Sequence, residues 1–237
     1  MRKLLRLTAP IVLFGLALSG CVPVTSPAPL PSQSGSQIST PTRPSARTFA
    51  DVVRIMEPVA ERECEARTRN VNCDFQIVVD SRPDQPANAY QTRDANDRPV
   101  IAFTQALIAE AENVDELAFV MGHEASHHIA GHIDRQRGVA TVGAIVFGSL
   151  ASATGADSSA VKTAQDLGAT VGARTFSKDY ELEADALGTI IAHNAGFDPV
   201  RGAQYFARIP DPGNRFLGTH PPNAARMDTV RRTARGL

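Results

Sequence analysis

Residues 113–132 read NVDELAFVMGHEASHHIAGH. The first of them, Asn113, is a residue type that caps helices, and Glu116 follows three positions later, as in a capping box. Apolar side chains then recur every three or four residues from Leu117 to Ala125, which is the spacing of a helix that buries one face. This stretch predicts an amphipathic helix that begins at Asn113 and also carries the histidines that follow.

The histidines of this helix have the spacing of metal ligands. His123 and His127 are four positions apart, so both imidazoles can bind one ion from successive turns. Glu124 projects to the flank of the pair, where it can take a proton from a metal-activated water instead of binding the metal. The pentapeptide also occurs by chance, so two surface histidines remain the alternative interpretation at this point.

A catalytic zinc needs a third protein ligand and one open position. A third His ten residues after the first is one known arrangement, but Ile133 occupies that position. Residues 180–188, YELEADALG, instead supply Glu181 on a later predicted helix, with Asp185 one turn beyond it. Gly188 continues the same stripe, and a small residue there would let this helix pack close to the first and bring a carboxylate to the ion.

Together these motifs resemble the gluzincin metallopeptidases that include HtpX, BepA and the CaaX prenyl endopeptidases. Their pattern is His-Glu-x-x-His followed by Glu-x-x-x-Asp. The resemblance extends through the AGFDP segment at residues 195–199 and the THPP segment at residues 219–222, the latter followed by Arg226. It covers roughly residues 88–235, beginning with NAY at 88–90, and is weak upstream.

The resemblance implies a zincin-like fold with one Zn²⁺ per chain. In this family pattern His123, His127 and Glu181 bind zinc, and Glu124 is the general base. Asp185 would hold a ligand histidine in the correct tautomer. Glu183 lies about 200° around the helix from Glu181 and is expected to be a surface or structural carboxylate.

His220, in the THPP segment, is expected to face the zinc cleft. It could stabilise the oxyanion as a catalytic donor, or it could occupy the open position and suppress activity. The plain alternative is that a His-Pro corner only shapes the loop. We expect His128 and His132 to point off the ligand face and His193 to stand alone, so none of the three is assigned chemistry.

The N-terminal residues predict export and a lipid anchor. Residues 1–20 have the layout of a signal peptide, namely a basic start followed by a short apolar run, and they end in Leu-Ser-Gly before Cys21, which resembles a lipobox. An ordinary signal with a chance Cys is the alternative. Residues 21–47 hold six of the sixteen Pro and predict a disordered tether. The expected location is the periplasm, with the lipid on Cys21 holding a domain of residues 48–237 to the outer membrane.

Two further cysteines lie in the predicted domain. Cys64 and Cys73 flank a short segment, and in an oxidising compartment they are expected to form a disulfide. Free buried thiols are the alternative. A structural zinc site is not expected, because no further pair accompanies them.

The remaining patterns predict an α+β fold that is predominantly helical. A helix is expected from Phe49 to about Thr68, with a kink or break at Pro58, and strands are expected at residues 75–80 and 100–103. Residues 138–156 carry no charge. They are expected to form a buried or cleft-covering helix, with a membrane span or contact with a membrane surface as alternatives.

Charge and location complete the functional expectation. With 24 Lys and Arg against 25 Asp and Glu, and no basic stripe, nucleic-acid binding is excluded as a function. The expected function is a zinc metalloendopeptidase that cuts unfolded or misassembled envelope proteins, bound in extended form beside an edge strand near Val100–Phe103. The alternative is a latent, zinc-stabilised chaperone or binding module in which His220 plugs the metal site.

Overall fold

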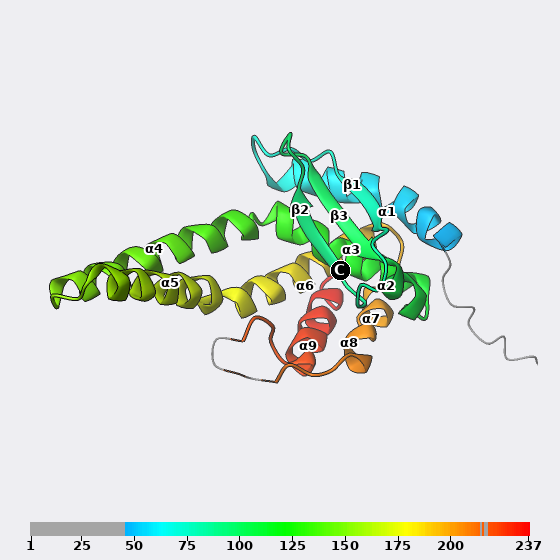
Figure 1. Ribbon diagram of the computed structural model, residues 1–237. Helices are drawn as coiled ribbons and strands as arrows, with labels where there is room; N and C mark the ends of the chain where they lie inside the picture. Colours follow the sequence, from blue (N-terminus) through cyan, green and yellow to red (C-terminus); the bar gives the residue numbers. More distant parts are fainter. Residues whose placement is uncertain (1–45, 214, 216–217) are drawn as a thin grey trace, which may run out of the picture. The chain divides into compact units, whose positions relative to one another are not determined.

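The computed structural model describes residues 46–213, 215 and 218–237 (Figure 1). The predicted signal peptide, Cys21 and nearly all of the predicted tether lie outside the described residues. The elements are α1 (Ala46–Arg67), β1 (Gln76–Asp80), β2 (Ala89–Arg93), β3 (Pro99–Thr104), α2 (Gln105–Glu110), α3 (Val114–Ile129), α4 (His132–Ala153), α5 (Ser158–Thr175), α6 (Ser177–Asn194), α7 (Pro199–Gly202), α8 (Tyr205–Arg208) and α9 (Asn223–Ala234). The expected α+β fold, mostly helical with a small sheet, is confirmed.

The sheet has the order β1-β3-β2, with β1 parallel and β2 antiparallel to β3. The two predicted strands are present as β1 and β3, whereas β2 was not predicted. The expectation that residues 100–103 form an edge strand is wrong. Most residues of β3 are buried, and its backbone groups pair with a strand on each side, so the two edge strands of this sheet are β1 and β2.

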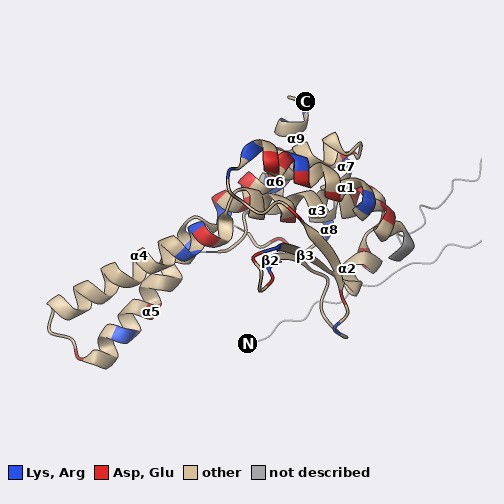
Figure 2. Cartoon of the chain, turned by 90° about the horizontal axis from the view of Figure 1, so that it is seen from above, with Lys and Arg blue, Asp and Glu red and all other residues tan. Residues whose placement is uncertain are grey.

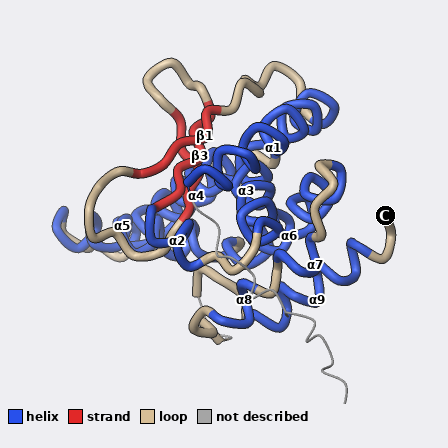
Figure 3. The backbone as a smooth tube through the Cα atoms, turned by 90° about the vertical axis from the view of Figure 1, so that its right-hand side faces the viewer, coloured by secondary structure: helices blue, strands red, loops and turns tan. Residues whose placement is uncertain are grey.

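The central helix α3 lies between the sheet and α6, with the sheet on one side and α6 on the other (Figure 3). Its predicted start is confirmed, because Asn113 Oδ1 accepts a hydrogen bond from the Glu116 backbone N–H at 3.2 Å. The Glu116 carboxylate accepts from the backbone N–H of Glu112 at 2.8 Å and from Arg208 of α8 at 2.6 Å. This N-terminus is therefore tied both to its own cap and to a distant helix.

The first helix runs without a break through Pro58 as α1. It packs against α3, and buried apolar side chains from the two helices and the sheet form one core. The largest of its fully buried members include Met56, Phe75, Ile101, Phe103, Leu117 and Met121.

The uncharged segment forms most of α4, which pairs with α5 in a helical hairpin that extends away from the sheet (Figures 1 and 2). The two helices approach closely because Gly143 and Gly168 face each other's backbone, with no room for a Cβ on either. The expectation of a buried or cleft-covering helix is wrong, since Val142, Ile145 and Leu150 are 60–66% exposed and no residue of the segment 138–156 lines the cleft described below. Among the described helices, none is both long and apolar enough to cross a membrane.

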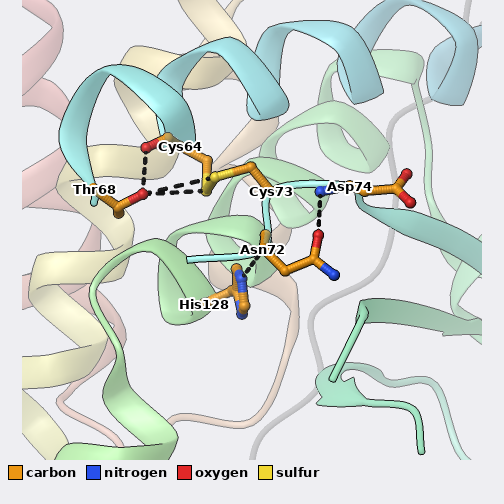
Figure 4. The surroundings of a disulfide bond; sticks show 6 residues. All are labelled: Cys64, Thr68, Asn72, Cys73, Asp74 and His128. Carbon is orange, nitrogen blue, oxygen red and sulfur yellow. Dashed lines mark hydrogen bonds between the residues drawn. A yellow bond between two sulfur atoms is a disulfide. The ribbon is translucent and has the colours of Figure 1, made fainter. Parts of the chain in front are cut away.

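Cys64 and Cys73 form a disulfide that joins α1 to the segment preceding β1 (Figure 4). The segment between them also contacts α3, because His128 Nε2 donates a hydrogen bond to the Asn72 carbonyl oxygen at 2.7 Å. Burial lowers the pKa of His128, so this imidazole is neutral at pH 7. The disulfide therefore lies at a junction of α1, β1 and the C-terminal end of α3.

Candidate metal centre

The site begins where α3 and α6 cross. A Cβ added to Gly122 would lie 2.8 Å from the Gly188 carbonyl oxygen, and one added to Gly188 would lie 2.7 Å from the His123 backbone nitrogen. Only glycines allow the two helices to come this close. The predicted close packing at Gly188 is present, and it places the carboxylates of α6 beside the histidines of α3.

Three side chains meet at this crossing. His123 Nε2 and His127 Nε2 are 3.0 Å apart. Glu181 Oε2 lies 3.6 Å from His123 Nε2, and Glu181 Oε1 lies 3.4 Å from His127 Nε2. All three ligand atoms lie within 4.8 Å of one another.

This donor set fits a divalent metal ion. Bonds of about 2.0 Å in a tetrahedral site separate the ligand atoms by about 3.3 Å, close to the observed spacing. Two imidazole nitrogens and one carboxylate oxygen are a set that zinc uses in catalytic sites, with a fourth position left for water or substrate.

Asp185 supports the first histidine from behind. It is fully buried, and its Oδ1 lies 2.9 Å from His123 Nδ1. Arg226 of α9 donates to both carboxylate oxygens, at 2.8 and 2.6 Å. Burial acts to raise the pKa of Asp185, but the hydrogen bonds from Arg226 and His123 outweigh it and lower the pKa. The ionised carboxylate accepts a hydrogen bond from His123 Nδ1–H, so the Nε2 lone pair of His123 faces the metal centre.

His220 lies at the mouth of the site. Its Nδ1 is 3.0 Å from Glu181 Oε2, and its side chain is 53% exposed. Burial acts to raise the pKa of Glu181, but hydrogen bonds from His127 and His220 hold this pKa well below its usual range. The structure thus places His220 in the cleft beside a predicted ligand, as expected.

The expectation that His132 points away from the ligand face is wrong. Its Nδ1 lies 2.8 Å from His127 Nδ1, and its Nε2 lies 3.1 Å from Glu183 Oε2. Burial lowers the pKa of His132 to about 4, so the ring is neutral at pH 7. Helical spacing would turn His132 away from His127, but Gly131, with φ of 65°, ends that helix and starts α4. The glycine was the available signal for this change of direction.

Other predicted positions lie apart from the metal centre. Glu183 binds His132 and Arg135 and is not among the three converging donors, as expected. His128 faces the Asn72 carbonyl oxygen, and His193 lines a separate shallow surface pocket.

The metal centre opens into a cleft of about 700 Å³. The edge strand β2 forms one wall, through Ala89, Tyr90 and Gln91. Glu124 of α3 also lines the cleft, beside the three donors. Apolar side chains contribute part of the remaining surface, among them Leu107, Phe119, Val120, Phe206 and Ile209, and polar side chains such as Asn223 and Arg226 also line it. An extended peptide could therefore lie along β2 with one of its bonds near Glu124.

Comparisons with known proteins agree with this architecture. The model of "Peptidase family M48" matches residues 46–234. The beta-barrel assembly-enhancing protease of Escherichia coli strain K12 is 30% identical over 151 residues, covering 56% of this chain and 30% of that protein. Its counterpart in Yersinia pestis is 29% identical over 147 residues, with 56% and 30% covered.

A candidate enzyme of the same kind in Vibrio cholerae is 32% identical over 130 residues, covering 52% of this chain and 26% of that protein. The chain thus spans less than a third of the length of these relatives. The family model, in contrast, covers α1 to α9 and includes every residue of the metal centre. The chain therefore belongs to peptidase family M48, a family of metallopeptidases.

Proposed function

We propose that this chain is a zinc-dependent endopeptidase of the bacterial cell envelope that cuts unfolded or misassembled proteins. The observation that carries the proposal is the convergence of His123, His127 and Glu181 in a cleft that also holds Glu124 and is lined by β2, an edge strand of the described sheet. When bound, zinc would polarise the scissile carbonyl and make a water molecule acidic enough to attack it at neutral pH.

The residues of the chain supply the remaining chemistry. Glu124 takes the proton of the attacking water and passes it to the leaving amine. His220 donates a hydrogen bond to the negative charge that develops on the carbonyl oxygen. The edge strand β2 pairs with the substrate backbone, which gives affinity with little sequence selection, as a protease of unfolded chains requires.

The location belongs to the same proposal. A lipid on Cys21 would hold the domain in the periplasm, at the outer membrane. The names of the relatives, beta-barrel assembly-enhancing proteases, support a role among envelope proteins.

The direct test is digestion of casein, an unfolded protein, by the full-length chain with and without a chelator. Glu124→Gln should reduce turnover by at least about 10²-fold, because general acid–base catalysis contributes about 10²–10⁴-fold, while bound zinc stays at one per chain. Glu65→Gln, on an exposed position of α1, is the matched control and should digest casein normally. Digestion that persists in both the chelated protein and Glu124→Gln would refute the mechanism.

The contact between His220 and Glu181 also favours a second candidate, a latent chaperone or binding module in which His220 plugs the metal site. His220→Ala separates the two. If His220 assists catalysis, this variant loses about 10²-fold in kcat; if His220 plugs the site, casein digestion rises. In the second case Glu124→Gln would leave the biological phenotype intact.

A further inference from the structure

The second ring nitrogen of His127 faces another histidine. His127 Nδ1 lies 2.8 Å from His132 Nδ1, and His132 Nε2 lies 3.1 Å from Glu183 Oε2. His132 is 4% exposed, whereas about half of the Glu183 side chain is accessible. A continuous line of hydrogen bonds thus runs from a half-exposed carboxylate on α6, through a buried imidazole on α4, to a predicted metal ligand on α3.

The chemistry of the three side chains determines which atom donates and which accepts in each of these hydrogen bonds. An ionised carboxylate only accepts hydrogen bonds, so the proton on His132 must lie on Nε2, facing Glu183. Burial of the His132 side chain favours its neutral form. The Nδ1 atom of this form holds a lone pair and accepts a hydrogen bond from His127. The proton on His127 therefore lies on Nδ1, and its Nε2 is left with the lone pair that faces His123 and Glu181.

We propose that His132 and Glu183 are positioning residues that hold His127 in the Nδ1–H tautomer, with its Nε2 lone pair aimed at the metal centre. The inference rests on the proposed metal site. It makes the two histidine ligands equivalent, since each is oriented by a carboxylate of α6. Asp185 acts on His123 directly, at 2.9 Å, whereas Glu183 acts on His127 through His132.

Tyr180 and Arg135 hold the side chains of His132 and Glu183 in place. The His132 ring stacks on Tyr180, with ring centroids 4.7 Å apart and planes 15° from parallel. Arg135 donates to Glu183 Oε2 at 2.8 Å and lies 4.4 Å from the centre of the Tyr180 ring. These contacts fix both the ring plane of His132 and the oxygen that it faces, and metal ligands are oriented by such supporting hydrogen bonds.

Three variants distinguish the effect of the hydrogen bond between His127 and His132 from the effect of packing of the His132 ring. His132→Phe keeps a ring against Tyr180 but removes the acceptor. His132→Asn places an amide oxygen close to the position of Nδ1, so it restores an acceptor for the His127 proton. Glu183→Gln replaces an obligate acceptor by a group that can also donate. The proton of His132 is then no longer held on Nε2. Asp134→Asn, an exposed position in the first turn of α4, is the control.

Two measurements on the full-length chain read out the effect without peptide hydrolysis. Nitrogen-15 NMR of the imidazole rings in the metal-free protein at pH 7.5 reports the tautomer of His127, and competition with a chelator reports zinc affinity. His132→Phe and Glu183→Gln should weaken zinc binding 10- to 100-fold and convert His127 to a mixture of tautomers. His132→Asn and Asp134→Asn should stay within a few-fold of the unmodified chain.

The proposal is overturned if His132→Phe binds zinc normally and His127 keeps the Nδ1–H tautomer. It is also overturned if His132→Asn loses as much zinc affinity as His132→Phe while the tautomer is unchanged, because packing alone would then explain the loss. If circular dichroism shows that His132→Phe does not fold, the zinc affinity and the His127 tautomer of Glu183→Gln decide the proposal. A chain that binds zinc with these dependences but cuts no protein would contradict the proposed function and leave this inference standing.

Discussion

Asp185 and Arg226 form a buried ion pair that also orients the predicted metal ligand His123. Both carboxylate oxygens of Asp185 bond to Arg226, and Oδ1 also faces the imidazole of His123. Arg226 in turn lies 3.7 Å from the centre of the Phe206 ring. Removing one member of a buried ion pair leaves an uncompensated charge and costs about 3–5 kcal/mol. The pair therefore contributes to folding as well as to the tautomer of His123.

Asp80 forms a cluster of hydrogen bonds with Arg82 and Tyr90, apart from the metal centre. It accepts hydrogen bonds from Arg82, at 2.6 Å to Oδ2, and from the Tyr90 hydroxyl at 3.2 Å, and so links the end of β1 to β2. The hydrogen bonds from Arg82 hold the pKa of Asp80 well below its usual range. This stabilisation is complete above the unfolded pKa, about 3.9, and is lost as the pH falls through the folded pKa.

We therefore expect Asp80→Asn to lower the Tm at pH 7 and to flatten the fall of Tm between pH 4 and pH 2, measured by circular dichroism. Asp51→Asn, which removes an exposed pair with Arg54, should change neither. Equal Tm values for Asp80→Asn and the unmodified chain at pH 7 would contradict the prediction.

At the scale of elements, the glycines at the crossing of α3 and α6 determine how near the carboxylates of α6 come to the histidines. The sequence predicts α3 and α6 as helices, because apolar spacing and an N-cap are local features. The short strand β2, AYQTR, was missed because it is mostly polar and partly exposed, without the apolar run that marks β3. Its pairing with β3 is a long-range contact that no local pattern specifies.

Gly188→Ala should push the two helices apart, because its Cβ would meet the His123 backbone at 2.7–2.9 Å. Overpacking of this kind destabilises by about 1–3 kcal/mol, and zinc affinity should fall with it. Gly138→Ala, with nothing within 4 Å of the added Cβ, should be neutral or stabilise α4 by up to about 1 kcal/mol. Urea unfolding and chelator competition measure both effects. Unchanged zinc affinity in Gly188→Ala would show that the crossing tolerates the methyl group.

At the scale of the whole molecule, the described chain joins three kinds of structure: the sheet with α1 and α3, the helices around the metal centre, and the α4–α5 hairpin. The hairpin has few contacts with the other elements. Of its residues, only those near its base, such as Ile133 and Gln136, line the cleft. The disulfide, in contrast, lies in the main core, where Cys64 is fully buried.

Replacing Cys64 and Cys73 together by Ala should lower the free energy of unfolding by about 2–3 kcal/mol, the loop-closure value for a separation of 9 residues. Zinc content should remain at one per chain, because neither residue contacts the three donors. Urea unfolding with and without reductant measures the change, and reductant should have no effect on the double variant. A double variant as stable as the oxidised chain would refute the prediction.

Local features of the fold follow from the sequence alone: the capped helix with its two histidines, the carboxylates one turn apart on α6, and the glycine that allows close packing. These follow from hydrogen bonding and periodicity within a few turns of chain. Contacts between distant segments establish three further features: β1 and β2 are the edge strands on either side of β3, residues 138–153 lie in the exposed α4–α5 hairpin, and the His132 ring contacts His127. Each of these depends on contacts between segments far apart in sequence, or on a change of chain direction at Gly131, which helical spacing does not encode.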